Sequence, residues 1–232
     1  MAPVTTRRFE KDAANGMGVR GYLHAPKIAS GDGLVLTHGA GQNCKSPLLV
    51  AVAAAFCEAG LMVLRCDLVF RQVRPLGPPV WHGCAESDRQ GLRHALDALR
   101  KIVRGRVFLG GHSYGGRQSS VLASEDPALV EGLLLLSFPL HSPKHPDRVR
   151  TAHFAALQTP ALFVHGTRDG FGTIKELTAA IATIPARKQL LSIQGAGHEL
   201  MTKANQRDLP QEVTRAFAAF LKPAAKIKKR EV

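Results

Sequence analysis

The apolar residues of this chain gather in short runs that alternate with longer segments of helical character. Six runs have the length of strands: residues 33–37, 61–65, 106–110, 130–138, 161–164 and 189–193. Five segments predict helices: residues 47–58, 86–101, 116–124, 173–184 and 211–221. Residues 70–81 contain three prolines and predict a long loop.

Strands that are apolar throughout, with helices between them, are typical of a parallel sheet covered on both faces. The alternation therefore predicts an α/β fold: a three-layer α/β/α sandwich with a mostly parallel sheet. We expect one domain over residues 19–221, preceded by an N-terminal segment (1–18) and followed by a basic tail (222–232). A chain of 232 residues can bury roughly 70% of its unfolded surface, so this domain needs no disulfide or metal for stability.

Composition narrows the class of protein. With 45% hydrophobic and 21% charged residues the chain is globular, and no apolar run approaches the ~18 residues that span a bilayer. Residues 1–11 lack the apolar stretch of a secretory signal. The four cysteines are widely spaced, which argues against a zinc ribbon or a disulfide scaffold and fits reduced thiols. We therefore expect a cytoplasmic protein without membrane association.

Charge is the unusual feature of the composition. The chain has 31 Lys and Arg against 18 Asp and Glu, a net charge of +13. Most basic residues are scattered and aromatic residues make up only 6%, whereas a nucleic-acid binder concentrates both on one surface. We expect a solvated basic surface and no specific nucleic-acid binding. An acidic substrate or partner stays open, and nothing indicates the oligomeric state.

Two glycine-rich turns follow predicted strands, where the functional groups of parallel sheets gather. His38-Gly39-Ala40-Gly41 follows the strand at 33–37, and residues 110–116 follow the next central strand. The second turn contains the pattern G-x-S-x-G around Ser113, which places a serine on a sharp strand-to-helix turn. A phosphate-binding turn is the alternative, but neither G-x-x-x-x-G-K-[ST] nor G-x-G-x-x-G occurs after a strand.

A serine nucleophile needs a base, and the base needs an orienting acid. Asp169 follows the strand at 161–164 and His198 follows the last predicted strand, giving the chain order Ser, Asp, His. Asp67, also just after a strand, is the reserve candidate for the acid. Ser113, Asp169 and His198 are the predicted catalytic residues.

These motifs resemble those of the α/β-hydrolase superfamily over residues 19–221. The turn at 38–41 matches its oxyanion loop, residues 111–115 its nucleophile elbow, and Asp169 and His198 its acid and base. The chain is more narrowly similar to the small lidless group related to dienelactone hydrolases. Within that group it resembles the proteins grouped with testis-expressed protein 30 and the third subunit of the non-specific-lethal chromatin complex. This narrower likeness rests on Arg65-Cys66-Asp67, Phe138-Pro139-Leu140 and residues 165–172.

The resemblance implies a hydrolase of carboxylic esters or related acyl bonds that works through an acyl-enzyme. The backbone N–H groups of Ala40 and Tyr114 would form the oxyanion hole. His38 and Arg71 are candidates for contact with the substrate, and no metal or organic cofactor is needed. Residues 140–160 are too few for a helical lid, so we expect a small-molecule acyl substrate or one presented from outside.

Three alternatives stay open. A peptidase or a thioesterase would use the same three residues, because leaving-group preference depends on the shape of the pocket. A non-catalytic binding or scaffold protein could keep the fold, with the basic tail contacting a polyanion. Ser113 also replaces the cysteine nucleophile of dienelactone hydrolases proper, so their lactone substrate does not carry over to this chain.

Overall fold

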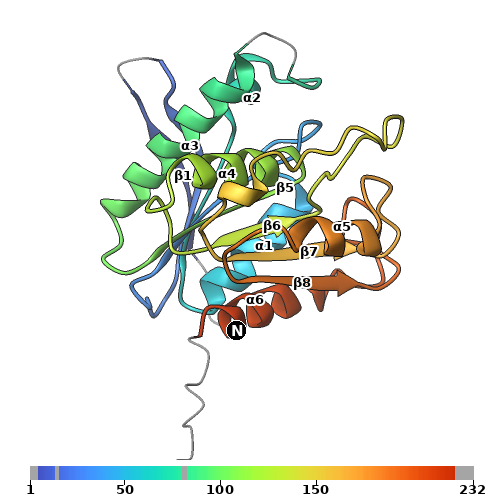
Figure 1. The fold of residues 1–232 in the computed structure, drawn as a ribbon. Coiled ribbons are helices and arrows are strands. Elements are labelled where there is room, and N and C mark those ends of the chain that lie inside the picture. The colour runs from blue at the N-terminus through green and yellow to red at the C-terminus, as the bar shows by residue number, and fades with distance from the viewer. Residues whose placement is uncertain (1–4, 14–15, 80–82, 223–232) are drawn as a thin grey trace, which may run out of the picture.

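A single sheet organises the protein. The computed structural model describes residues 5–13, 16–79 and 83–222, and in these residues eight strands pair in the order β1-β2-β4-β3-β5-β6-β7-β8 (Figure 1). The strands are β1 (Thr5–Lys11), β2 (Val19–Ala25), β3 (Gly33–Thr37), β4 (Met62–Cys66), β5 (Val107–His112), β6 (Leu133–Leu136), β7 (Ala161–Gly166) and β8 (Lys188–Ile193). From β4 to β8 every pairing is parallel, whereas β1–β2 and β2–β4 are antiparallel.

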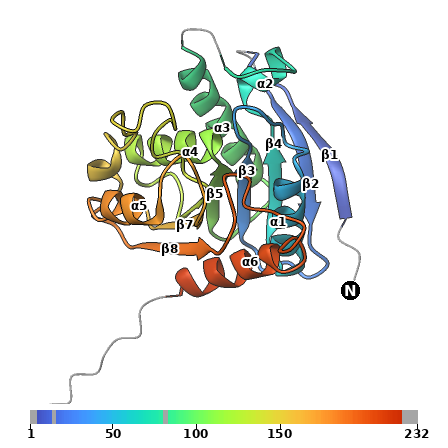
Figure 2. The ribbon, with the colours of Figure 1, turned by 90° about the vertical axis from the view of Figure 1, so that its right-hand side faces the viewer.

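Helices cover both faces of the sheet (Figure 2). On one face α1 (Pro47–Glu58) packs with α6 (Leu209–Phe220), and on the other lie α3 (Cys84–Arg100), α4 (Tyr114–Glu125) and α5 (Ile174–Ile181). The central strands explain this division, because alternate side chains of a strand point to opposite faces. In β6, for example, Leu133 and Leu135 join one core cluster, whereas the other two leucines join the second.

Local sequence sets the ends of several helices. Ser46 precedes α1 and its hydroxyl accepts a hydrogen bond from the Leu49 N–H, while Pro47 occupies the first turn, where no intrahelical partner for an N–H is lost. Thr173 and Glu176 form a reciprocal capping box at the start of α5. These signals lie within a few residues of each other, which is why the helices could be placed from the sequence.

The predicted three-layer α/β sandwich is confirmed, and most predicted elements are present within a few residues of their expected bounds. The strand expected at 130–138 is shorter, because only Leu133–Leu136 pair with both neighbours. The loop expected at 70–81 was wrong at its start, since α2 (Val69–Val73) forms there, and residues 80–82 lie outside the described part.

The N-terminal region contributes more than the sequence suggested. No strand was predicted before residue 33, yet β1 and β2 form a hydrogen-bonded pair at the edge of the sheet. The sheet thus begins inside the segment (1–18) that we placed before the domain. The expected basic tail lies outside the described residues from position 223 onward.

The connection from β6 to β7 leaves the carboxyl edge of the sheet open. Residues 137–160, all described, contain one short 3-10 helix, η1 (Phe154–Ala156), which packs near α4. No helical lid is inserted in this segment. The loops that follow β3, β5, β7 and β8 therefore meet beside an open cavity.

Candidate active site

Ser113 lies between β5 and α4 in a strained conformation. Its φ is 50° and its ψ is −116°, a region that non-glycine residues rarely adopt. The flanking glycines are required by close approach: a Cβ on Gly111 would lie 2.7 Å from the Gly116 nitrogen, and one on Gly115 would lie 2.6 Å from the His38 carbonyl oxygen. The turn therefore holds the Ser113 hydroxyl at the end of the sheet, as the pattern G-x-S-x-G predicts.

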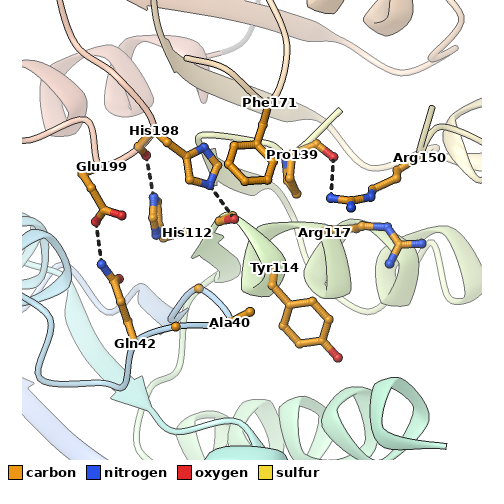
Figure 3. Close-up of a pocket in the computed structure, with 13 residues that line it drawn as sticks. Ala40, Gln42, His112, Tyr114, Arg117, Pro139, Arg150, Phe171, His198 and Glu199 are labelled. Carbon is orange, nitrogen blue, oxygen red and sulfur yellow. Dashed lines mark hydrogen bonds between the residues drawn. The ribbon is translucent and has the colours of Figure 1, made fainter. Parts of the chain in front are cut away.

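A hydrogen-bonded chain joins the three residues predicted as catalytic. The Ser113 hydroxyl lies 2.8 Å from His198 Nε2, and His198 Nδ1 lies 3.0 and 2.9 Å from the two carboxylate oxygens of Asp169 (Figure 3 shows the first contact). A carboxylate only accepts hydrogen bonds, so Nδ1 carries the proton and Nε2 is free to accept from the serine. The sequence prediction placed these residues on three separate loops, and the structure brings them together.

The Asp169 carboxylate is buried and kept ionised by its surroundings. Burial raises the pKa of Asp169, but the hydrogen bonds and charges of its neighbours, those of His198 foremost, together leave that pKa below its ordinary value. The Phe171 N–H also donates to this carboxylate at 2.8 Å. An ionised Asp169 can hold the imidazole in one tautomer and stabilise the imidazolium form.

Two further side chains fix the position of His198. The His112 ring donates from Nε2 to the His198 carbonyl oxygen at 2.8 Å, which ties the loop after β8 to the end of β5. The Phe171 ring stacks on the His198 ring with centroids 4.1 Å apart. Sequence reasoning missed the role of Phe171, although Phe171 lies only two residues after Asp169.

A cavity of about 690 Å³ opens above Ser113. Ala40 and Tyr114, the predicted oxyanion-hole residues, both line it beside the serine. Tyr114 is the first residue of α4, so its N–H has no acceptor within the helix and is available to a ligand. Its side chain is anchored below the cavity, because the hydroxyl donates to the buried Asp88 carboxylate at 2.8 Å.

The expectation that Arg71 and His38 contact the substrate needs correction, because neither lines this cavity. The Arg71 guanidinium is buried and donates to four backbone carbonyls, of which Ala40 lies in the oxyanion loop and Gln42 directly follows it. The His38 ring is fully buried, donates to the Gly39 carbonyl and accepts from a backbone N–H of the loop after β4. Both side chains hold the oxyanion loop instead.

Asp67, the reserve acid, lies elsewhere in the network. Its carboxylate accepts from the Cys44 N–H at 2.6 Å and lies 3.5 Å from His38 Nε2, whereas Asp169 occupies the position next to His198. Cys44 is buried, and burial raises the pKa of its thiol to about 12, so the thiol stays protonated at neutral pH.

The sequence did not point to two arginines that line the cavity. Arg117 lies on α4 one turn after Ser113, and Arg150 comes from the segment between β6 and β7. Arg117 directly follows the glycines of the elbow, and its spacing of four residues from Ser113 on a helix could have indicated that the two lie on the same side. Arg150 had no local signal, because only the fold brings its segment to the cavity.

Among the described residues, no group of three or more His, Cys, Asp or Glu side chains is arranged to hold a metal ion. Within the same part of the chain, no helix combines the length and the apolar character needed to cross a membrane.

An eight-stranded, mostly parallel sheet with a serine on a strained turn after its fifth strand defines the class of α/β hydrolases. Residues 31–224 match a family model described as an alpha/beta hydrolase domain, so the chain belongs to the α/β-hydrolase family.

Solved structures of known proteins share this fold at low sequence identity. A dienelactone hydrolase from Anabaena variabilis is 21% identical, with 94% of this chain and 99% of that chain covered and a TM-score of 0.75. A serine hydrolase homologue from Coxiella burnetii is 19% identical, with coverages of 90% and 96% and a TM-score of 0.73. A serine hydrolase without a lid from Xanthomonas campestris is 15% identical, with coverages of 97% and 99% and a TM-score of 0.72.

Proposed function

We propose that the protein is a serine hydrolase that cleaves a carboxylic ester or a related acyl bond through Ser113, His198 and Asp169. The observation that carries this proposal is the continuous hydrogen-bonded chain from the Ser113 hydroxyl to the buried Asp169 carboxylate, beside an open cavity. The hydrolase names of the three structural neighbours are consistent with it.

The geometry supports a two-step reaction. His198 Nε2 takes the Ser113 proton as the oxygen attacks the substrate carbonyl, and the same nitrogen then delivers that proton to the leaving group. Water attacks the acyl-enzyme in the second step with His198 again as the base. The N–H groups of Ala40 and Tyr114 are the proposed donors to the oxyanion, and loss of one such donor typically raises the barrier by about 3–4 kcal/mol.

In the described part of the chain, no lid covers the cavity at the C-terminal ends of the strands, and this favours a small acyl substrate over one with a long buried acyl chain. The segment after β6 contributes Pro139 and Arg150 to the cavity lining but no covering helix. The narrower likeness to testis-expressed protein 30 and the chromatin-complex subunit stays part of this proposal.

A cytoplasmic location, expected from the cysteines, also stays a prediction. The four cysteines are all buried free thiols: Cys44, Cys57, Cys66 and Cys84.

A fluorophosphonate probe tests the nucleophile directly. We expect one covalent adduct by intact mass on the wild-type protein, none on Ser113→Ala, and much slower labelling of His198→Ala. Ser119→Ala is the matched control, because Ser119 is a buried serine of α4 whose hydroxyl donates to a backbone carbonyl. Asp169→Asn should reduce kcat for a short acyl ester by about 10³- to 10⁴-fold, since the wrong histidine tautomer is favoured.

Absence of an adduct on the folded wild-type protein would overturn the proposal and favour a binding protein that retains the fold. If labelling succeeds, rates on matched ester, thioester and amide substrates decide among esterase, thioesterase and peptidase.

A further inference from the structure

Two arginines in the cavity have no carboxylate partner. Among the described residues, no Asp or Glu lies within ion-pair distance of Arg117 or Arg150. The guanidinium of Arg150 makes one long contact, 3.5 Å to the Pro139 carbonyl, and the Nε of Arg117 is buried without any hydrogen-bond partner. Both side chains are half-buried, so water replaces the missing partners only in part.

Three other arginines, in contrast, have carboxylate or carbonyl partners. Arg89 lies against Glu86 and Glu125, Arg93 pairs with Asp126 at 2.9 Å, and Arg71 donates to backbone carbonyls. Arg117 and Arg150 differ from these three arginines, because within the described residues neither has a carboxylate partner and their guanidinium groups together make a single long contact. Because a partly desolvated cation without a partner is unfavourable, this arrangement calls for an anion that the chain itself does not supply.

Positive charge outweighs negative charge around Arg117, where, among the described residues, only Tyr114 acts to raise the pKa of the guanidinium. Burial, and then the charge of Arg150, lower the pKa of Arg117, and Arg89 adds to the same effect. His153, near Arg117, is kept neutral because burial and the Arg117 charge lower its pKa to about 4. The acidic residue of the cavity lining, Glu199, accepts from the Gln42 amide at 2.6 Å, and Figure 3 shows that pair at the opposite end of the site.

The position of the two arginines relates them to the proposed reaction. Figure 3 shows Arg117 and Arg150 together at one end of the cavity, with Phe171 and Pro139 between them and His198. Arg117 follows Ser113 by one helical turn, a rise of roughly 5.4 Å. An anion held there would lie several bonds from a carbonyl carbon at Ser113.

We propose that Arg117 and Arg150 bind an anionic group, such as a carboxylate, on the substrate that Ser113 attacks. This inference rests on the proposed function and narrows its substrate class to esters that also carry a free, ionised acidic group. A guanidinium presents two parallel N–H donors to a carboxylate, so two of them bind such a group strongly and fix its position. Arg117 and Arg150 are then the specificity-determining residues of the site.

Matched esters test this specificity. Mono-4-nitrophenyl adipate carries a carboxylate on its acyl part, and 4-nitrophenyl hexanoate is its uncharged counterpart. We expect the wild-type protein to favour the charged ester at least tenfold in kcat/KM, a preference that weakens as salt is added. Arg117→Gln and Arg150→Gln should each reduce the ratio of the two kcat/KM values by about tenfold, the usual scale for one charge-assisted hydrogen bond.

Control variants separate binding from folding. Arg148→Gln removes an exposed arginine two residues before Arg150, and should keep the ratio within about twofold of the wild type. Arg117→Lys keeps the charge but loses the paired donors, so its ratio should lie between those of wild type and Arg117→Gln. A second pair, 4-acetoxybenzoate and its methyl ester, places the charge on the leaving group and shows which side of the scissile bond the anion occupies.

The outcomes distinguish this inference from the proposed function. If hydrolysis requires Ser113 but neither ester pair shows a charge preference that depends on Arg117 or Arg150, the inference fails and the hydrolase stands. If the folded wild-type protein hydrolyses neither ester, the proposed function fails, and binding decides the inference: Ser113→Ala should bind mono-4-nitrophenyl adipate at least tenfold more tightly than the hexanoate ester. Hydrolysis that persists in Ser113→Ala also refutes the proposed function, and the charge preference of that hydrolysis then decides the inference. Equal affinity of Ser113→Ala and its Arg117→Gln derivative for the charged ester would overturn the anion site.

Discussion

The backbone strain at Ser113 leads us to a prediction about the stability of its variants, which can be tested without knowing the substrate. A residue with a Cβ at φ 50° and ψ −116° is held there by its surroundings, at an expense of about 1–3 kcal/mol. Glycine adopts positive φ without that strain. Ser113→Gly should therefore yield a more stable protein than Ser113→Ala, although both variants lose the hydroxyl and its hydrogen bond to His198.

The magnitude follows from two opposing contributions. Relief of strain favours the glycine variant by about 1–3 kcal/mol, and the greater freedom of an unfolded glycine opposes it by about 0.5–1 kcal/mol. The net advantage over Ser113→Ala is about 1 kcal/mol. Unfolding entropy near 2.1 cal/mol/K for each of 232 residues converts this into a rise in Tm of about 2 °C.

Chemical denaturation of the two variants measures the difference, with Ser119 as the matched position. Ser119 lies inside α4, where Ser119→Gly should be less stable than Ser119→Ala by about 1 kcal/mol. The glycine variant should thus have the higher free energy of unfolding at position 113, and the alanine variant the higher one at position 119. If Ser113→Gly is the less stable variant by the amount seen at Ser119, the turn is not strained and the reasoning is refuted.

Two further predictions concern the oxyanion loop and acid stability. Arg71→Met removes the guanidinium that donates to the Ala40 and Gln42 carbonyls. In an ester assay we therefore expect kcat to fall about tenfold to a hundredfold with KM little changed. An unaltered kcat in the folded variant would show that the oxyanion loop does not need this support. On acidification, the free energy of unfolding should fall as the pH drops from 6.5 to 4, by up to about 1.4 kcal/mol per pH unit for each contributing histidine. The unfolded chain takes up protons from pH 6.5 downward, whereas burial lowers the pKa of three histidines in the folded state to about 4: His24, His38 and His153. Urea titrations at pH 7 and 5 check this, and equal stability at both would contradict it.

Much of the fold was predictable because its signals are local. Continuous apolar runs such as the leucines of β6 are buried on both faces, and a strand of that kind has few alternatives. The edge strand β1 escaped prediction for the opposite reason: five of its seven residues are exposed, and it exists through pairing with β2. The short helix α2 was missed because its ordering depends on contacts with α3 and on the buried Asp88, which accepts from the Phe70 N–H.

The residues of the candidate site likewise fall into those that the sequence indicates and those that it does not. Ser113, Asp169 and His198 could be chosen from the sequence, because each follows a predicted strand in a set chain order. Arg71 was misjudged, since a sequence shows the charge of an arginine near the sheet edge but not whether backbone carbonyls already occupy its donors.

What the sequence by itself determined is therefore the layered α/β architecture and the identity and order of the three residues at the strand ends, because both follow from periodicity and glycine placement over a few neighbouring positions. Only the tertiary structure decided that His198 stacks on Phe171, that Arg71 holds the oxyanion loop, and that Arg117 and Arg150 meet in one cavity. These are contacts between segments far apart in the chain, and their geometry depends on how helices and loops pack on the sheet rather than on any local pattern.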